Sequence, residues 1–309
     1  MTKPDGDQNR GCGYLPPEES SNVKSDGATL AVHSRGSSGE VVLLLHGGPG
    51  CPDYLEPVAR ALSSRFRAVT FDQRGVGASP ASGTYEIVDY VADVEAVRCH
   101  LGVETMHLFG HSWGGLLAQL YVDDFPARVA SLVLANSASG VGEQWKQTER
   151  EVLTYNRHRA GLPGFAALGF WAAASRLPGR AGDGAGRRML TRVWRNYFPD
   201  PASAPAPDPA WLRGAHSSAA IKTVVAVRRA NSSRLDGLGS RLAAPVLVVY
   251  GDDDIYGPST THVRSRFPMA QQAILGHCGH LPWIQAPEAF ASLLREFYIC
   301  VTPTPVDRA

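Results

Sequence analysis

Residues 110–114 have the residue types and spacing of a nucleophilic turn. The segment reads G-H-S-W-G, follows the apolar run ETMHLFG and precedes the apolar segment LLAQLYVDD. Between a strand and a helix, a G-x-S-x-G turn strains the backbone of its serine and points the hydroxyl outward from the carboxyl end of a sheet. Gly110 and Gly114 are needed because a Cβ at either position would collide with the neighbouring strand or helix. We therefore predict that Ser112 is a nucleophile.

A serine hydroxyl needs a neighbouring base before it becomes a useful nucleophile. With this kind of turn, an acid and then a histidine follow the serine along the chain. His280 is favoured among the ten histidines because it follows the last predicted strand, in GHCGHLPW. A loop at that edge of the sheet can reach Ser112. His277, which lies closer to the end of the strand, is the alternative.

The acid that orients the imidazole is expected after the preceding predicted strand, PVLVVYG. Asp252, Asp253 and Asp254 follow that strand directly. Asp254 is favoured because the turn needs a residue or two before a side chain can point back across the sheet. Asp252 and Asp253 are expected to form the turn itself through Asx hydrogen bonds.

Acyl transfer also needs backbone donors for a developing oxyanion, each contributing about 3–4 kcal/mol where measured. The N–H of Trp113, which follows the serine, is one predicted donor. The second is expected in the loop after an early strand, HGGPG. Gly48 is the favoured donor and Gly47 the alternative, since glycines let the backbone approach a substrate closely. His46 precedes the serine and ends the strand, so we predict a structural hydrogen-bonding role for it.

Short apolar runs that alternate with helical patterns must position these residues. The predicted strands lie within residues 40–48, 67–75, 104–110, 128–137, 245–254 and 270–280, and the predicted helices include 87–101 and 116–124. Continuous apolar runs separated by helices are typical of a parallel sheet that is covered on both faces. The sequence therefore predicts an α/β fold with a mostly parallel central sheet.

This alternation stops between about residues 139 and 238. The stretch holds four of the six tryptophans (Trp145, Trp171, Trp194 and Trp211) and the loop FPDPASAPAPDP. We interpret it as an inserted helical cap, whose tryptophans either line an apolar pocket or pack its core. The predicted organisation is a flexible lead-in over 1–25, a core over 26–138 and 239–300, a cap over 139–238 and a tail over 301–309.

Taken together, the motifs HGGPG, DQRGVGAS, GHSWGG, GDDD and GHCGHLPW resemble those of the α/β-hydrolase superfamily, in particular its proline iminopeptidase branch. The resemblance covers roughly residues 28–298. It implies a Ser–Asp–His triad at Ser112, Asp254 and His280, and an oxyanion-hole glycine at Gly48. Within DQRGVGAS, Asp72 and Arg74 match a family motif, and we interpret them as bracing the turn after the strand.

The resemblance implies a serine hydrolase that releases an N-terminal proline from small peptides through an acyl-enzyme. The cap departs from the branch, because it lacks a G-P-x-E-F-like stretch that would supply a carboxylate for the substrate's ammonium group. Residues 140–237 hold fifteen Lys or Arg and seven Asp or Glu, a net charge of +8 that repels ammonium groups. Glu143, Glu149 and Glu151 form the only close acidic cluster, and we expect them on a solvated helix face.

The alternative function is an esterase, lactonase or tailoring hydrolase that acts on a small metabolite. A ligand-binding receptor on the same fold is a further class, against which the complete predicted triad argues. The expected partner is a small-molecule or short-peptide substrate. The formal net charge of +1 gives no indication of a nucleic-acid partner, and no apolar run has the ~20 residues that a membrane span needs.

No cofactor and no metal are expected. HGGPG lacks the Lys-Ser/Thr pair of a P-loop, and no G-x-G-x-x-G opens a helix. The five cysteines fit neither a disulfide framework nor a zinc site, so we predict a reduced, cytoplasmic protein. Cys51 and Cys278 flank the predicted site, and we expect them to be neutral packing residues.

Overall fold

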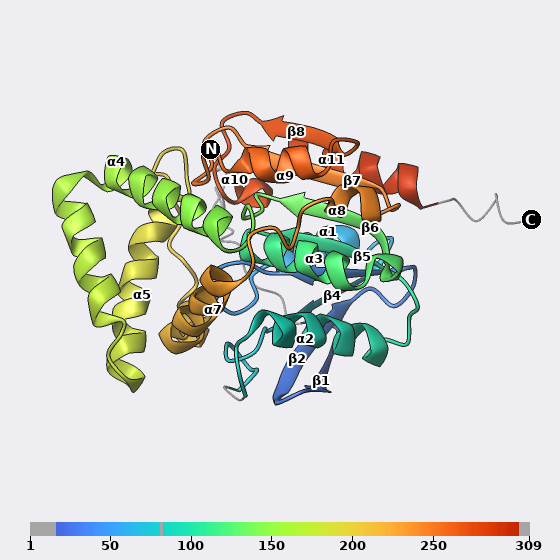
Figure 1. The fold of residues 1–309 in the computed structure, drawn as a ribbon, viewed down its shortest axis with the longest axis horizontal. Coiled ribbons are helices and arrows are strands. Elements are labelled where there is room, and N and C mark those ends of the chain that lie inside the picture. Colours follow the sequence, from blue (N-terminus) through green and yellow to red (C-terminus); the bar gives the residue numbers. More distant parts are fainter. Residues whose placement is uncertain (1–16, 81–82, 303–309) are drawn as a thin grey trace, which may run out of the picture.

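The computed structural model describes residues 17–80 and 83–302, and an eight-stranded sheet lies at its centre (Figure 1). The strands are β1 (Glu19–Ser25), β2 (Ala28–Arg35), β3 (Val41–Leu45), β4 (Arg67–Phe71), β5 (Met106–His111), β6 (Val129–Ala135), β7 (Val246–Gly251) and β8 (Gln271–Leu275). The helices are α1 (Glu56–Leu62), α2 (Ile87–His100), α3 (Trp113–Asp124), the 3-10 helix η1 (Pro126–Arg128), α4 (Glu143–Ala174), α5 (Gly179–Asn196), α6 (Pro209–Gly214), α7 (Ser217–Arg229), α8 (Leu238–Arg241), α9 (Thr260–Arg266), α10 (Pro282–Gln285) and α11 (Pro287–Val301).

The strands lie in the order β1-β2-β4-β3-β5-β6-β7-β8, and β3 to β8 are all parallel. The predicted mostly parallel sheet is therefore confirmed. The chain adds β4 on one side of β3 and then β5 on its other side. Loops at the carboxyl ends of strands diverge at such a switch point and leave a crevice between them. The loops after β3 and β5, which carry HGGPG and Ser112, meet there.

Alternate side chains of the central strands pack into two separate cores. In β3, Leu43 and Leu45 join the core that contains residues of α2 and α3. Val42 and Leu44 join the opposite core, which contains residues of α1 and α11. Successive side chains of a strand point to opposite faces, so a sheet that is covered on both sides needs apolar residues at every position. This explains the unbroken run VVLLL.

The N-terminal edge of the sheet differs from the prediction. Residues 1–25 are predicted as a flexible lead-in, but Glu19–Ser25 forms β1 and pairs antiparallel with β2, a strand that the sequence analysis also misses. Five of the seven residues of β1 are exposed, because it is an edge strand with little apolar surface to bury. The pattern therefore has neither the continuous apolar run nor the strict alternation that identifies a strand. Residues 1–16 of the predicted lead-in lie outside the described residues.

Between β6 and β7, the predicted cap region contains the helices α4, α5, α6 and α7, joined by loops, and no strand over residues 139–237. Helices α4 and α5 pack side by side and extend away from the sheet (Figure 1). Helix α4 is kinked at Gly161, whose φ is 62°. Of the predicted C-terminal tail, Val301 still belongs to α11, and residues 303–309 lie outside the described part of the chain.

Helix α3 begins at Trp113, three residues earlier than predicted, because the helix starts directly after the nucleophile turn. Across residues 17–80 and 83–302, no helix has the length and apolar content to cross a membrane.

Candidate functional site

Ser112 occupies the sharp turn between β5 and α3, with φ 56° and ψ −121°. The flanking glycines are needed for the predicted reason. A Cβ on Gly114 would lie 2.0 Å from the carbonyl oxygen of Leu45 in β3, and one on Gly110 would lie 2.5 Å from the carbonyl oxygen of Gly114. The close packing of strand, turn and helix therefore excludes any larger residue at either position and holds Ser112 in its strained conformation.

The three predicted side chains of the triad lie together at the carboxyl edge of the sheet. Ser112 Oγ is 3.0 Å from His280 Nε2, and His280 Nδ1 is 3.1 Å from Asp254 Oδ1. All three residues are buried. The alternative histidine, His277, is exposed, and its backbone N–H donates to the carboxylate of Asp252. The geometry therefore favours His280 over His277 as the partner of Ser112.

Two donors that the sequence analysis does not identify hold the carboxylate of Asp254. The Asn136 side-chain amide donates to Oδ2, and the Tyr256 backbone N–H donates to Oδ1 at 2.8 Å. Asn136 directly follows β6 and has a φ of 46°. A polar residue at the end of a buried strand, at the same sheet edge as the predicted triad, is the signal that could have identified it.

Asp252 and Asp253 do not form the predicted Asx turn. The carboxylate of Asp252 accepts hydrogen bonds from the backbone N–H groups of His277 and Cys278, both at 3.0 Å, and these bonds lower the pKa of Asp252. Asp253 instead forms an ion pair with Arg159 of α4. The Asx bond within this turn belongs to Asp254, through the N–H of Tyr256. Asp252 thus anchors the loop that carries His280, and Asp253 anchors the cap.

The backbone N–H groups of the two predicted oxyanion donors, Gly48 and Trp113, are available to a substrate, whereas that of the alternative donor, Gly47, already has a partner. The N–H of Gly47 donates to the hydroxyl oxygen of Tyr54 at 2.8 Å. Among the described residues, the N–H groups of Gly48 and Trp113 have no acceptor. Gly48 has a φ of 78°, which favours glycine, and it lines the same small cavity as Ser112. The geometry therefore fits Gly48 and Trp113 as the donor pair.

Gln73 ties together the two segments that carry these donors. Its side-chain amide donates to the carbonyl oxygen of His46 at 2.7 Å, and its side-chain oxygen accepts from the indole N–H of Trp113 at 2.8 Å. The Gln73 backbone N–H also donates to His46 Nε2 at 3.2 Å, so His46 Nδ1 carries the proton and donates to the Gly47 carbonyl. Burial lowers the pKa of His46 and keeps it neutral. The predicted structural role of His46 is confirmed.

The predicted bracing roles of Asp72 and Arg74 are also confirmed. The carboxylate of Asp72 accepts from the backbone N–H groups of Asp53 at 2.9 Å and Ala78 at 2.7 Å. Arg74 forms two hydrogen bonds of 2.7 Å with Asp93 of α2. These bonds fix the loop after β4 against the segment that follows HGGPG and against α2.

A small cavity of about 20 Å³ lies over the nucleophile, and we call it the nucleophile cavity. Most of its lining is aromatic or apolar, and the lining residues are Gly48, Cys51, Tyr54, Ser112, Leu190, Trp194, Tyr197, Trp211, His280 and Leu281. Two of the four cap tryptophans thus face the predicted site. Trp145 instead packs against Trp113 in the core, and Trp171 lies under the guanidinium of Arg188 on the cap. Trp194 and Trp211 therefore line a pocket, whereas Trp145 packs in a core.

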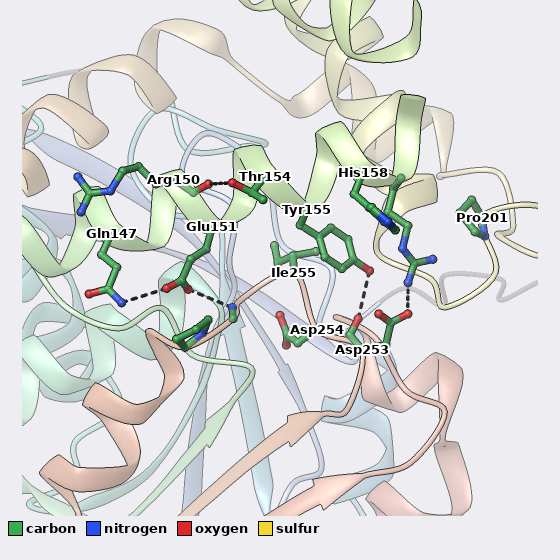
Figure 2. A pocket seen from close by; sticks show the side chains of 13 residues that line it. Gln147, Arg150, Glu151, Thr154, Tyr155, His158, Pro201, Asp253, Asp254 and Ile255 are labelled. Atoms are coloured by element: carbon green, nitrogen blue, oxygen red, sulfur yellow. Dashed lines mark hydrogen bonds and ion pairs between the residues drawn. The ribbon is translucent and has the colours of Figure 1, made fainter. Parts of the chain in front are cut away.

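A larger open cavity of about 1000 Å³ lies between α4 and the loop after β7 (Figure 2). Glu151 of α4 points at this loop, and its carboxylate accepts from the backbone N–H groups of Gly257 and Ser259 at 3.0 Å. Tyr155 of the same helix donates its hydroxyl to the carbonyl oxygen of Asp253 (Figure 2). The cap and the loop that carries Asp254 are thus held together through side chains of α4.

The carboxylates of the cap are largely committed to structural contacts. Glu143 pairs with Lys146 on the surface, as expected, but Glu149 pairs with Arg228 of α7 and Glu151 holds the loop after β7. The expectation of a solvated helix face is therefore wrong for Glu149 and Glu151. Three aspartates of the cap also accept hydrogen bonds from backbone N–H groups, namely Asp183, Asp200 and Asp208. Within the described residues, no carboxylate lines the nucleophile cavity.

Cys51 and Cys278 are buried, and burial raises the pKa of each thiol to about 12. Both are therefore neutral packing residues near neutral pH, as expected. In the part of the chain that the structure describes, no group of three or more His, Cys, Asp or Glu side chains has an arrangement that could hold a metal ion.

Comparisons with known proteins identify the fold family of the chain. A family model described as alpha/beta hydrolase fold matches residues 40–287. The proline iminopeptidase of Lactobacillus delbrueckii subsp. lactis is 27% identical over 275 residues, which cover 84% of this chain and 90% of that protein. The crystal structure of VinJ has a TM-score of 0.70 at 21% identity and covers 93% of this chain and 100% of its own. A thermophilic esterase from Thermogutta terrifontis has a TM-score of 0.62 at 22% identity, with coverage of 92% and 100%.

Proposed function

The chain belongs to the α/β-hydrolase fold family, and on that premise we propose that it is a serine hydrolase that cleaves an ester or amide through an acyl-enzyme on Ser112. The observation that carries this proposal is the 3.0 Å separation of Ser112 Oγ and His280 Nε2. An imidazole nitrogen at this distance can accept the hydroxyl proton as the oxygen attacks a carbonyl carbon.

In the acylation step, His280 Nε2 takes the proton of Ser112 while Oγ bonds to the carbonyl carbon. The carbonyl π electrons move to its oxygen, and the N–H groups of Gly48 and Trp113 stabilise the resulting oxyanion. His280 then gives its proton to the leaving group. Asp254 keeps the proton of the neutral imidazole on Nδ1 and stabilises the imidazolium that forms. Water repeats the sequence on the acyl-enzyme and releases the acid.

We propose that the substrate is a small ester whose groups next to the scissile bond are uncharged and apolar. The aromatic lining of the nucleophile cavity, with Tyr54, Trp194, Tyr197 and Trp211, supports this class. The engaged carboxylates and the +8 charge of the cap disfavour a substrate with an ammonium group near the reacting carbon.

Release of N-terminal proline from small peptides is the second candidate. The observation that favours it is the match to a proline iminopeptidase over 84% of the chain, and the HGGPG motif of this chain resembles that branch as well. This activity would require a cap carboxylate to leave its present partners and bind the substrate's amino group. We rank it second for that reason.

A fluorophosphonate probe and a substrate panel test the proposal. We expect the probe to label Ser112, and we expect Ser112→Ala to lose both labelling and at least about a thousandfold in kcat, as for other serine nucleophiles. The panel contrasts p-nitrophenyl acetate and butyrate with proline p-nitroanilide. Faster turnover of the esters supports the first candidate, and faster turnover of the anilide supports the second. Unchanged turnover by Ser112→Ala contradicts the serine hydrolase assignment itself.

A small-molecule substrate and a cytoplasmic location are part of the same proposal. The location is supported by the cysteines in the described residues, Cys51, Cys99, Cys278 and Cys300, which are all free.

A further inference from the structure

Tyr256 contacts both ends of the Ser112–His280–Asp254 arrangement. It follows Asp254 by two residues, and its backbone N–H donates to Asp254 Oδ1 at 2.8 Å. Its hydroxyl oxygen lies 3.0 Å from Ser112 Oγ. Between these two contacts, its ring stands edge-on to the ring of His280, with centroids 5.2 Å apart. The loop after β7 therefore brings a second hydroxyl to the nucleophile.

The direction of the Tyr256–Ser112 hydrogen bond follows from the neighbouring bonds. The carboxylate of Asp254 only accepts, so His280 Nδ1 carries the proton and Nε2 accepts the hydroxyl proton of Ser112. Ser112 Oγ has then spent its only proton, so Tyr256 must be the donor. Burial raises the pKa of Tyr256, which keeps the phenol protonated near neutral pH. Tyr256 is thus a hydrogen-bond donor and does not act as a proton carrier.

We propose that Tyr256 is a further catalytic residue, whose hydroxyl donates to Ser112 Oγ and speeds the departure of that oxygen when the acyl-enzyme is hydrolysed. The inference rests on the proposed function. In this step water bonds to the acyl carbon and His280 takes a proton from the water. The carbonyl π electrons move to the carbonyl oxygen, which becomes the oxyanion. When the carbonyl re-forms, the bond between carbon and Oγ breaks and its electron pair goes to Oγ. Oγ takes the proton from His280, and Tyr256 keeps its own.

The same hydrogen bond is expected to assist the two half-reactions to different extents. During acylation Oγ is the attacking atom, and a donor on its lone pair stabilises the forming charge but lowers its nucleophilicity. During deacylation Oγ is the leaving atom and gains negative charge as the bond breaks, so a donor assists throughout. Hydrogen bonds to charged groups are stronger than those to neutral ones. The net benefit therefore falls mainly on deacylation.

Tyr256→Phe tests this directly, because it removes the hydroxyl and keeps the ring against His280. Stopped-flow measurement of p-nitrophenolate release from p-nitrophenyl acetate gives the burst rate, which reports acylation. Deacylation is followed separately by loading Ser112 with p-nitrophenyl dimethylcarbamate, removing excess reagent and timing the return of esterase activity. We expect a burst rate within about threefold of wild type and a recovery rate about tenfold or more slower.

Tyr155→Phe is the matched control. The Tyr155 hydroxyl also bonds to the loop after β7, at the carbonyl oxygen of Asp253, but it does not contact Ser112. If Tyr256 only positioned the loop, both variants would slow recovery alike, and that result would overturn the proposal. Equal slowing of burst and recovery by Tyr256→Phe, or no change in either, would also overturn it.

A second pair of variants guards against a folding defect in Tyr256→Phe. Tyr256→Gln keeps a donor, whereas Tyr256→Met has similar length and no donor. We expect faster recovery with Gln than with Met, which loss of packing alone would not give, and equal recovery would refute the proposal. If the wild-type protein takes neither a carbamoyl nor a fluorophosphonate label on Ser112, the serine hydrolase function itself fails. If the wild type is labelled on Ser112 but the Tyr256 variants do not behave as expected, only the inference about Tyr256 is refuted.

Discussion

Asn136, at the end of β6, donates its side-chain amide to the oxygen of Asp254 that does not bond to His280. Because β6 and β7 are neighbours in the sheet, the residues that follow them meet at its carboxyl edge. Asn136 also donates to the carbonyl oxygen of Gly279 at 3.1 Å, next to His280. One side chain thus fixes both the carboxylate and the loop of the imidazole.

We expect Asn136→Ala to lower kcat/KM for p-nitrophenyl esters by about 10- to 100-fold, since a buried carboxylate loses a bond of about 1.5–3 kcal/mol. Most of the loss should appear in kcat, because the substrate does not contact Asn136. Asn231→Ala, at an exposed position, is the control and should change kcat/KM less than about twofold. A normal kcat for Asn136→Ala would contradict the positioning role.

The stability of the protein should depend on the protonation of Asp53. Burial raises the pKa of Asp53 from the ordinary 3.8 to about 6. A carboxyl whose pKa is raised in the folded state favours folding when it is protonated, and that contribution is lost as pH rises from about 4 through 6. We therefore expect Asp53→Asn to stabilise the protein by about 1–2 kcal/mol at pH 7.5 and to have little effect at pH 4.5. Urea unfolding at both pH values measures this, and an equal shift at both would refute it.

The thiols beside the site should resist alkylation. Because thiolates are the reactive form, the pKa of about 12 for Cys51 and Cys278 predicts very slow reaction with iodoacetamide at pH 7.5. The exposed Cys99 and Cys300 should react first, with esterase activity retained. Peptide mass spectrometry over a time course identifies the modified positions. Early loss of activity together with label on Cys51 would show that the thiol is more accessible than the structure indicates.

Variants of Glu151 distinguish a structural role for this carboxylate from a role in binding the substrate's amino group. Its carboxylate holds the backbone N–H groups of Gly257 and Ser259, so Glu151→Ala should lower the melting temperature and reduce kcat for all substrates. If Glu151 bound an ammonium group, Glu151→Gln would raise KM for proline p-nitroanilide and leave the esters unaffected. We expect equal effects of Glu151→Gln on the two substrate types. Glu143→Gln, on the surface of the same helix, should change neither.

The sequence supports a prediction of the fold core and of the residues that begin or end its strands. Ser112 and Asp254 follow strongly apolar runs, His280 follows the weaker run QQAIL, and their order along the chain is that of a known triad type. The edge strand β1 escapes prediction because it buries too little surface to impose a pattern. Its neighbour β2 is mostly buried, but polar residues interrupt its sequence ATLAVHSR, so it has no continuous apolar run.

The supporting contacts escape prediction for a different reason. Asn136, Gln73 and Tyr256 act through partners that are 118, 40 and 144 residues away in sequence. Their roles depend on which strands are neighbours and on the path of each loop. Composition and periodicity carry no information on either, so only the three-dimensional arrangement identifies these residues.

The volume of the nucleophile cavity sets a condition on catalysis. Its roughly 20 Å³ suits a single water-sized molecule, so a bound ester needs more room over Ser112 than the cavity offers. We therefore expect entry of a substrate to displace residues that line the cavity, among them Trp194 of α5 and Trp211 of α6. Part of the interaction energy with the substrate goes into that movement, so the measured affinity is weaker than the contacts alone would give. We therefore expect the energy needed to widen the nucleophile cavity to contribute to substrate selectivity.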